Sequence, residues 1–285
     1  MTKKLNWGEH TYIMGILNLT PDSFSGDGLM SGDDYVKNAI EQARQFLEEG
    51  ADILDMGAES TRPGSEPITA EEELQRLMPA LDAIRKEHPH TLISIDTYKS
   101  QVAQAVLQAG ADWINDIWGL HADPQLAGVA ANFQSGLVLM HNSSQNAKVE
   151  LKDGLGGRYV QTTGKDIIAV IKQGLLESAN QALQAGLIKE NIILDPGIGF
   201  GKNVTQNLEI IRRLREIKAL GYPLLVGPSR KSFIGYTLNL PPDQRLEGTA
   251  VAVALSIAGG ADIIRVHDVK FMHRVARMSD AILRS

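Results

Sequence analysis

The sequence predicts an α/β protein that folds as one (β/α)₈ barrel. Short apolar runs alternate with helical stretches along the whole chain, which is typical of parallel strands buried on both faces. Nearly every run stops at a polar or charged residue, and Gly-Ala-Asp occurs three times where a helical stretch ends and an apolar run begins. A doubly wound sheet would also alternate, but it would less readily supply eight strands that end in polar groups.

The predicted strands are defined by the apolar runs and the residues that follow them. In chain order they are Tyr12–Leu17 before Asn18, Ala51–Leu54 before Asp55, Leu92–Ile95 before Asp96, Trp113–Ile114 before Asn115, Leu137–Met140 before His141, Ile192–Leu194 before Asp195, Leu224–Val226 before Gly227, and Ile263–Val266, which encloses Arg265 and precedes His267. Because the C-terminal ends of barrel strands carry the active site, the pattern also predicts where the site lies.

Helices are predicted between these strands from caps and apolar periodicity. Asp33 or Asp34 can cap a helix that ends near residue 49, and Thr69 with Glu72 forms a capping-box pattern for residues 70–87. The other predicted helices cover residues 99–109, 124–132, 164–185, 203–219, 246–259 and 269–283. No change in composition interrupts the alternation, so we expect one domain over residues 1–285.

Three predicted connections are longer than a barrel needs. They cover residues 20–33, 59–69 and 142–164, and each follows a strand on the face that carries the site. Long loops at such a face often act as lids or binding loops. For residues 142–164, which are polar and rich in glycine, we favour a loose surface insertion.

Composition excludes several classes of function. A chain of 285 residues suits one barrel, and its net charge of −6 argues against a nucleic-acid-binding surface. The absence of cysteine excludes disulfides, thiolate catalysis and cysteine-ligated zinc. The first residues lack the apolar segment of a signal peptide, and the longest apolar stretch is too short for a bilayer. We therefore expect a soluble cytoplasmic protein without a membrane partner.

Asp96, Asn115 and Asp195 form the first candidate site, because three different strand ends would bring them into one cavity. Two carboxylates and an amide suit a heterocycle with adjacent N–H donors, such as an aminopyrimidinone edge. Oxygen ligands would also suit Mg²⁺, and a single aspartate at a strand end often caps the next helix. Three such residues together favour a functional site.

The segment after Asp195 reads Pro-Gly-Ile-Gly-Phe-Gly-Lys202 and predicts a tight turn that aims Asp195 inward. The spacing of its glycines does not match a nucleotide-binding P-loop, and we expect Lys202 to be solvated. In Ser229-Arg-Lys-Ser232, apolar flanks favour a site role for Lys231 and leave Arg230 undecided.

Arg265 and His267 alternate in the last strand and should face the same side. If that side is the barrel interior, both can contact phosphate oxygens, and Arg265 can stack on a flat ring. In the first two long loops, Asn18 is a possible Mg²⁺ ligand and Arg62 can complement a diphosphate. By composition alone these loops are only rich in turns.

These motifs together resemble the dihydropteroate synthase family over nearly the whole chain. The matching segments, in the family's order, are Met14–Ser25, Glu59–Gly64, Ser94–Thr97, Ile114–Ile117, Leu194–Lys202, Ser229–Gly235 and Arg265–Val269. The family joins 6-hydroxymethyl-7,8-dihydropterin diphosphate to 4-aminobenzoate, releases diphosphate, and is the target of sulfonamides. The resemblance therefore implies a transferase of folate biosynthesis with Mg²⁺ as its cofactor.

The resemblance also implies roles for individual residues. The pterin would be held by Asp96, Asn115, Ile117, Met140, Asp195, Lys231 and Arg265, of which Asp96, Asp195 and Lys231 would be catalytic. The diphosphate would contact Asn18, Asp22, Thr61, Arg62, Arg265 and His267, with the metal at Asn18. The aminobenzoate would contact Phe24, Thr61, Arg62, Pro63, Lys231 and Ser232.

Two other functions fit parts of the pattern. A methyltransferase domain that uses a methylated tetrahydrofolate would share the barrel and its acids, but would not need the Thr61–Pro63 and Ser229–Ser232 groups. A non-catalytic pterin-binding relative should have damaged diphosphate loops. Here the residues of those loops are intact: Asn18, Asp22, Arg62 and His267. Release of diphosphate that depends on 4-aminobenzoate would distinguish these possibilities.

One helix gives a prediction about assembly. Residues 249–258 are apolar almost all round, whereas a barrel helix normally has a polar outer stripe. We therefore expect a second copy of the chain to cover this face. The prediction is a homodimer formed through the last two helices, as the resemblance also implies.

Overall fold

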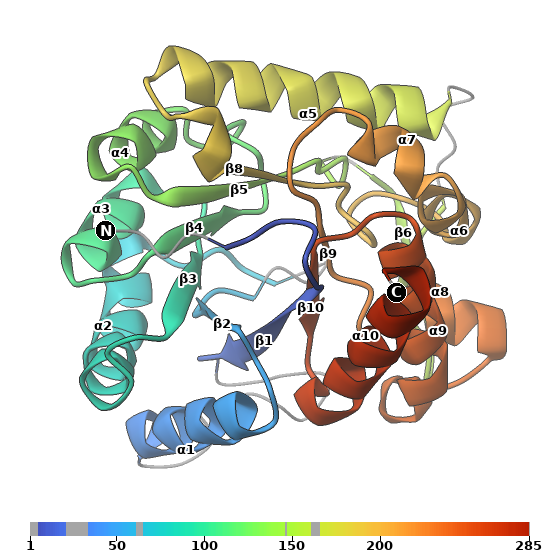
Figure 1. Ribbon diagram of the computed structural model, residues 1–285, viewed down its shortest axis with the longest axis horizontal. Helices are drawn as coiled ribbons and strands as arrows, with labels where there is room; N and C mark the ends of the chain where they lie inside the picture. Colours follow the sequence, from blue (N-terminus) through green and yellow to red (C-terminus); the bar gives the residue numbers. More distant parts are fainter. Residues whose placement is uncertain (1–4, 21–33, 61–64, 146, 161–165, 285) are drawn as a thin grey trace.

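The barrel predicted from the sequence is present in the computed structural model, which describes residues 5–20, 34–60, 65–145, 147–160 and 166–284. Eight parallel strands form one sheet, surrounded by helices (Figure 1). The strands are β1 (Tyr12–Asn18), β2 (Ile53–Gly57), β3 (Leu92–Asp96), β4 (Trp113–Asp116), β5 (Gly136–Met140), β8 (Ile192–Asp195), β9 (Leu225–Val226) and β10 (Ile263–Val266).

The sheet closes on itself. Its order is β8-β5-β4-β3-β2-β1-β10-β9, and a parallel bridge between Leu194 and Leu224 joins β8 to the residue before β9. The helices are α1 (Tyr35–Glu48), α2 (Ala70–Glu87), α3 (Ser100–Gln108), α4 (Gln125–Phe133), α5 (Ile167–Gln184), α6 (Val204–Arg212), α7 (Leu214–Lys218), α8 (Ser232–Leu238), α9 (Leu246–Ala258) and α10 (Val269–Leu283), with 3₁₀ turns at Lys189–Asn191 and Pro242–Gln244.

Most elements lie where the sequence predicts them. Asp34 caps α1 by accepting from the Lys37 amide, and Thr69 caps α2 by accepting from the Glu72 amide. The predicted helix over 203–219 is divided at Arg213 into α6 and α7. The short helix α8 was not predicted.

The prediction of a loose insertion over residues 142–164 is wrong for its described part. Residues 149–159 form an antiparallel hairpin of β6 (Val149–Lys152) and β7 (Gly156–Tyr159). Gly154 and Gly156 have φ of 74° and 77°, so the glycines that suggested looseness shape the turn instead.

The barrel interior is apolar at its N-terminal end. One inward-facing layer consists of Tyr12, Met14, Ile53, Leu92, Trp113, Val138, Ile193, Leu225 and Ile263, all at most 5% exposed. The outward side chains of the strands pack on the helices as a second core. Side chains of a strand point alternately into and out of the barrel. The next inward-pointing side chains toward the C-terminal ends of the strands are therefore available to form the site.

The Gly-Ala-Asp repeat has a function in the fold beyond ending helices. Gly50, Gly110 and Gly260 have φ of 101°, 101° and 99°, as expected for glycines that end helices. The aspartate two residues later accepts a main-chain N–H from the neighbouring strand segment. The pairs are Asp52 with Ile13 at 2.8 Å, Asp112 with Ile93 at 2.9 Å, and Asp262 with Leu224 at 2.7 Å. The repeat therefore joins adjacent strands at the N-terminal end of the barrel.

Within the described ranges, no helix is both long enough and apolar enough to cross a lipid bilayer.

Replacing Asp112 by alanine should lower the free energy of unfolding by about 2 kcal/mol, since it leaves the Ile93 amide and the Arg85 guanidinium without this acceptor. Urea denaturation measures the change. Asp82→Ala, at an exposed position on α2, is the matched control and should have little effect. Equal losses in the two variants would contradict the role assigned to the repeat.

Candidate active site

Strand register brings the predicted acids and amide together. Gly57 pairs with Asp96, and Asp96 pairs with Asn115, on three consecutive strands. On the next pair of strands Met140 lies beside Asp195. Asp96, Asn115, Met140 and Asp195 thus belong to one inward layer at the C-terminal end of the barrel.

Arg265 connects this layer across the barrel. Its Nε lies 2.6 Å from Asp55 Oδ2, and its Nη2 lies 2.8 Å from Asp96 Oδ2. Asp55 is fully buried and also accepts from Asn115 Nδ2 at 3.2 Å. The guanidinium is thus a partly buried cation, with 21% of its side chain exposed, and it has two carboxylate partners, which is the condition under which charges are tolerated in the interior.

Lys231 and Asp195 occupy the opposite side of this layer. Lys231 Nζ donates to the Ile198 carbonyl at 2.5 Å and lies 4.1 Å from the centroid of the Phe200 ring. Asp195 Oδ1 accepts the Gly197 amide at 2.7 Å. The turn after β8 therefore positions both charges, as the sequence predicted for Asp195.

A cavity of about 360 Å³ opens above these residues. Its wall includes Asn18, Thr20, Asp96, Ser229, Lys231, Ser232, Arg265 and His267, together with part of the β6–β7 hairpin. Ile117 lines a neighbouring cavity of about 310 Å³, which shares Glu59, Ser60, Tyr159 and Phe200 with the first. Buried carboxylates, cations and an adjacent cavity are what a polar flat ligand with an anionic group requires.

Comparisons with known proteins identify the family. The chain matches the family described as pterin binding enzyme over residues 14–267. It is 46% identical over 284 residues to dihydropteroate synthase of Clostridium beijerinckii, covering 99% of this chain and 98% of that protein. The chain belongs to the dihydropteroate synthase family. It is an enzyme, a transferase of folate synthesis.

Solved structures of this family have the same fold as the enzyme. The dihydropteroate synthase from Clostridium difficile in the presence of pteroic acid has a TM-score of 0.87 at 44% identity, over 99% of this chain and 100% of that one. That of Xanthomonas albilineans with 4-aminobenzoic acid has a TM-score of 0.85 at 34% identity, over 97% and 94%. That of Yersinia pestis in a sulfonamide drug complex has a TM-score of 0.87 at 34% identity, over 100% and 99%.

Some predicted site residues lie outside the described residues of the enzyme. These are Asp22 and Phe24 in the first long loop and Thr61, Arg62 and Pro63 in the second. Asn18 and His267 are described at the ends of β1 and β10, and both line the cavity. The ring of His267 lies 2.9 Å from Ser229 Oγ through Nδ1, which ties the last strand to the Lys231 loop.

The structure corrects the prediction for one cation and settles the contacts of a second. The prediction that Lys202 is solvated is wrong, because the side chain is 2% exposed. Its Nζ donates to the carbonyls of His141, Gly197 and Phe200 at 2.9, 2.9 and 3.0 Å. Arg230, which the sequence left undecided, forms an ion pair with Asp268 at 2.5 Å.

Asp55 is the site residue that sequence reasoning missed. The sequence pattern places Asp55 at the end of an apolar run, but β2 continues to Gly57, so Asp55 lies within the strand and faces the interior. The sequence signal for this position is Met56, because an apolar residue after Asp55 indicates that the strand continues. Inward and outward side chains then alternate, so Asp55 points to the same side as Ile53.

Burial shifts the pKa values of the acids and of the lysines around this layer in opposite directions. It raises the pKa of Asp96 to about 7, although Arg265 opposes the shift, and it raises the pKa of Asp195. It lowers the pKa of Lys231 to about 8 and that of Lys202 to about 7, and Asp195 opposes both shifts. For Lys202, the three carbonyl acceptors further favour the charged form.

Replacing Lys202 by methionine should lower the free energy of unfolding by about 3 kcal/mol, because three buried carbonyls lose a charged donor. Thermal and urea denaturation measure it. Lys86→Met, at an exposed position on α2, is the control. If the two variants were equally stable, Lys202 would not anchor the turn after β8.

Asp96 should make the stability of the free enzyme depend on pH. Because its folded pKa of about 7 exceeds the ordinary 3.8, the folded protein retains a proton that the unfolded chain has lost between these values. The contribution of Asp96 to stability should therefore fall as pH rises from 4 to 7. The difference in unfolding free energy between wild type and Asp96→Asn, measured in urea, should decline over this range. A difference that did not change with pH would refute the assignment.

Proposed function

We propose that the enzyme condenses 6-hydroxymethyl-7,8-dihydropterin diphosphate with 4-aminobenzoate to give 7,8-dihydropteroate and diphosphate. The observation that carries this proposal is the layer of buried Asp55, Asn115 and Asp195 with partly exposed Asp96, in which Arg265 lies between two of the carboxylates. Carboxylate and amide oxygens can accept from the adjacent N–H groups of a pterin ring. Names of relatives and of structures with pteroic acid and 4-aminobenzoic acid support the same substrates.

The proposed reaction begins with cleavage of the bond between the pterin methylene carbon and the diphosphate oxygen. The diphosphate leaves with the electron pair, and positive charge develops on the methylene and the pterin ring. Asp96 and Asp195 would stabilise that charge, since fixed carboxylates in a dry site act strongly on a developing cation. The neutral amine of 4-aminobenzoate then forms the new C–N bond and loses a proton. Within this scheme Lys231 holds the pterin and lies beside the path of the amine.

The residues around Asn18 fit the proposed Mg²⁺. Asn18 lines the cavity together with Thr20 and His267, where a diphosphate would lie. In the described part of the chain, no group of three or more acidic or histidine residues could hold a metal unaided. Mg²⁺ commonly takes one or two protein oxygens and completes its shell with water and substrate phosphates. We propose that Asn18 supplies its protein ligand, and that the ion neutralises charge on the leaving diphosphate.

Sulfonamides are proposed to compete with 4-aminobenzoate at the rim of the cavity. Ser232 and Lys231 line the cavity at that rim, and a relative has been solved with a sulfonamide drug. The other residues proposed for this part of the site, Phe24 and Thr61–Pro63, lie in the two long loops outside the described residues.

The experiment that tests the function measures diphosphate release with and without 4-aminobenzoate in the presence of Mg²⁺. Asp195→Asn should lower kcat about 100-fold while changing the affinity for the pterin much less, because it keeps the shape but removes a charge that acts on the transition state. Rapid kinetics and calorimetry separate the two effects. A raised KM for the pterin at unchanged kcat would overturn the role of Asp195, and diphosphate release independent of the amine would overturn the reaction.

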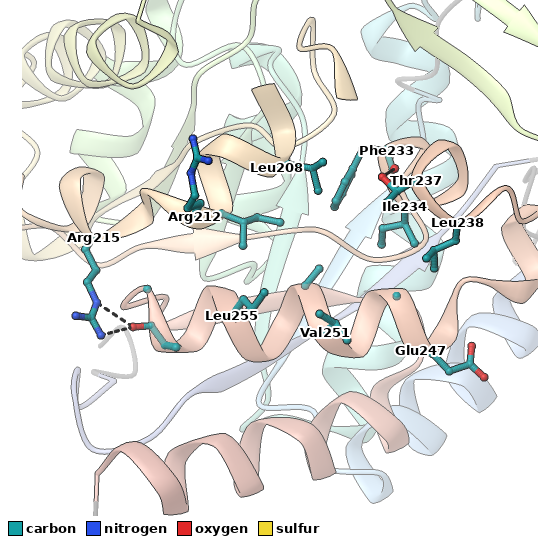
Figure 2. A pocket seen from close by; sticks show the side chains of 15 residues that line it. Leu208, Arg212, Arg215, Phe233, Ile234, Thr237, Leu238, Glu247, Val251 and Leu255 are labelled. Carbon is teal, nitrogen blue, oxygen red and sulfur yellow. Dashed lines mark hydrogen bonds between the residues drawn. The ribbon is translucent and has the colours of Figure 1, made fainter. Parts of the chain in front are cut away.

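We also propose that the enzyme is a homodimer through α9 and α10. Val251 and Leu255 on α9 are 60% and 54% exposed, and with Leu208 of α6 and Leu238 of α8 they line an apolar groove (Figure 2). The adjacent α10 packs on α9 and exposes Phe271, Met278 and Ile282. Large exposed apolar side chains on two adjacent helices are typical of a protein–protein interface.

Light scattering should give the mass of a dimer at micromolar concentration. Leu255→Glu should shift the protein toward the monomer, since it places a charge in the centre of the proposed interface. Leu183→Glu, at an exposed position on α5, should leave the mass unchanged. A wild-type monomer would contradict the proposal.

A further inference from the structure

The β6–β7 hairpin is held against α8 by specific contacts. Tyr236 Oη of α8 donates to the Gly156 carbonyl at 2.9 Å, and the Arg158 guanidinium lies 5.0 Å from the centroid of the Tyr236 ring. At the turn of the hairpin, Leu155 is 5% exposed. The hairpin is therefore packed on the helix that begins at Ser232, directly after Lys231.

Arg245 is the cation that joins the hairpin to the rest of the site. The side chain is buried, and its guanidinium donates to main-chain carbonyls in three different segments. Nη2 donates to Leu155 at 2.9 Å, Nη1 to Arg230 at 2.9 Å, and Nε to Leu240 at 3.1 Å. A planar guanidinium fixes the relative positions of its acceptors, so this one residue determines the distance between the hairpin turn and the Arg230 peptide.

The surroundings are shaped to admit this guanidinium. A Cβ at Gly235 of α8 would lie 2.2 Å from Arg245 Nη2, so any side chain there would displace it. The accepting peptide at Arg230 is held in the left-handed region, with φ of 54°, and the Arg230 amide donates to Thr249 Oγ1 at 3.0 Å. A non-glycine residue keeps such a conformation only where several contacts determine it.

The two segments joined by Arg245 line one cavity. Leu151, Gly157 and Tyr159 from the hairpin line the same cavity as Lys231 and Ser232. Leu151 is 81% exposed on the hairpin, so an apolar side chain is presented at the edge of the cavity without being used to build the core. The hairpin therefore contributes an apolar and glycine-lined surface to the cavity that also holds the cations, as a flat aromatic ligand with a charged end would require.

We propose that Arg245 is a positioning residue that fixes the β6–β7 hairpin as a wall of the aromatic amine subsite, in the cavity that Lys231 and Ser232 also line. The inference rests on the proposed function, because it assigns this side of the cavity to the amine substrate. Removing the Arg245 guanidinium should therefore weaken binding of the amine substrate more than binding of the pterin. The residues on β3, β4 and β8 that are proposed to hold the pterin are not among the hydrogen-bond partners of Arg245.

The test compares Arg245→Met with Arg85→Met. Arg85 also donates to main-chain carbonyls, those of Thr91 at 2.7 Å and Gly110 at 2.8 Å, but at the N-terminal end of the barrel. Arg245→Met should raise KM for 4-aminobenzoate about tenfold, with a smaller change in kcat and an unchanged calorimetric affinity for the pterin. Arg85→Met should destabilise the protein without changing this KM.

Hydrogen exchange gives a second readout that does not depend on catalysis. Amides of residues 154–159 should exchange faster in Arg245→Met than in wild type or Arg85→Met, because the hairpin turn loses its anchor. If Arg245→Met does not fold, Tyr236→Phe replaces it, since it removes only the bond to Gly156. It should show a smaller change in the same two measurements.

The outcomes separate this inference from the proposed function. An active wild type whose amine KM and hairpin exchange are unaffected in Arg245→Met, or in Tyr236→Phe where that variant replaces it, overturns the inference alone. Equal losses of pterin and amine affinity would also overturn it, because they would indicate general loosening. If the wild type lacks amine-dependent diphosphate release, the proposed function fails, and hairpin exchange alone decides whether Arg245 positions the hairpin.

Discussion

The site depends on one partly buried cation held between two carboxylates. Arg265 on β10 reaches across β1 to Asp55 on β2 and Asp96 on β3, so the pair of bonds spans four consecutive strands of the barrel. None of these charges would be tolerated alone in the interior. Together they make a polar layer possible directly above an apolar one. Asp55 Oδ1 and Ser94 Oγ are buried there without a hydrogen-bond partner among the described residues, so the layer retains polar capacity for a ligand.

The sequence predicted the positions of strand ends better than the environment of each side chain. Asp96, Asn115 and Asp195 could be placed because strand register alone brings them together. The environment of Lys202 could not be predicted, because its three carbonyl acceptors come from loops after two different strands. A basic residue after a glycine turn has the same local pattern whether it is solvated or buried, and only tertiary contacts decide.

The hairpin shows a second limit of local patterns. Its residues are polar and rich in glycine, which is typical of a loose loop, and its strands are short. A hairpin of this length has little stability alone, so the contacts that hold it come from Tyr236 and Arg245, far away in the sequence. The sequence pattern of residues 149–159 does not indicate these contact partners.

The pairing of the first strand, β1, with the last strand, β10, has a consequence for the order in which the chain can fold during synthesis. The Gly-Ala-Asp aspartates of β2 and β4 join strands that are consecutive in the sequence, so these junctions can form as the chain emerges. The first strand differs, because its outer edge pairs with β10 and the Thr11 amide and hydroxyl donate to Asp280 of α10 at 2.7 and 2.8 Å. The edge of β1 therefore stays unpaired until β10 and α10 have been synthesised, and the barrel becomes a closed cooperative unit only after that.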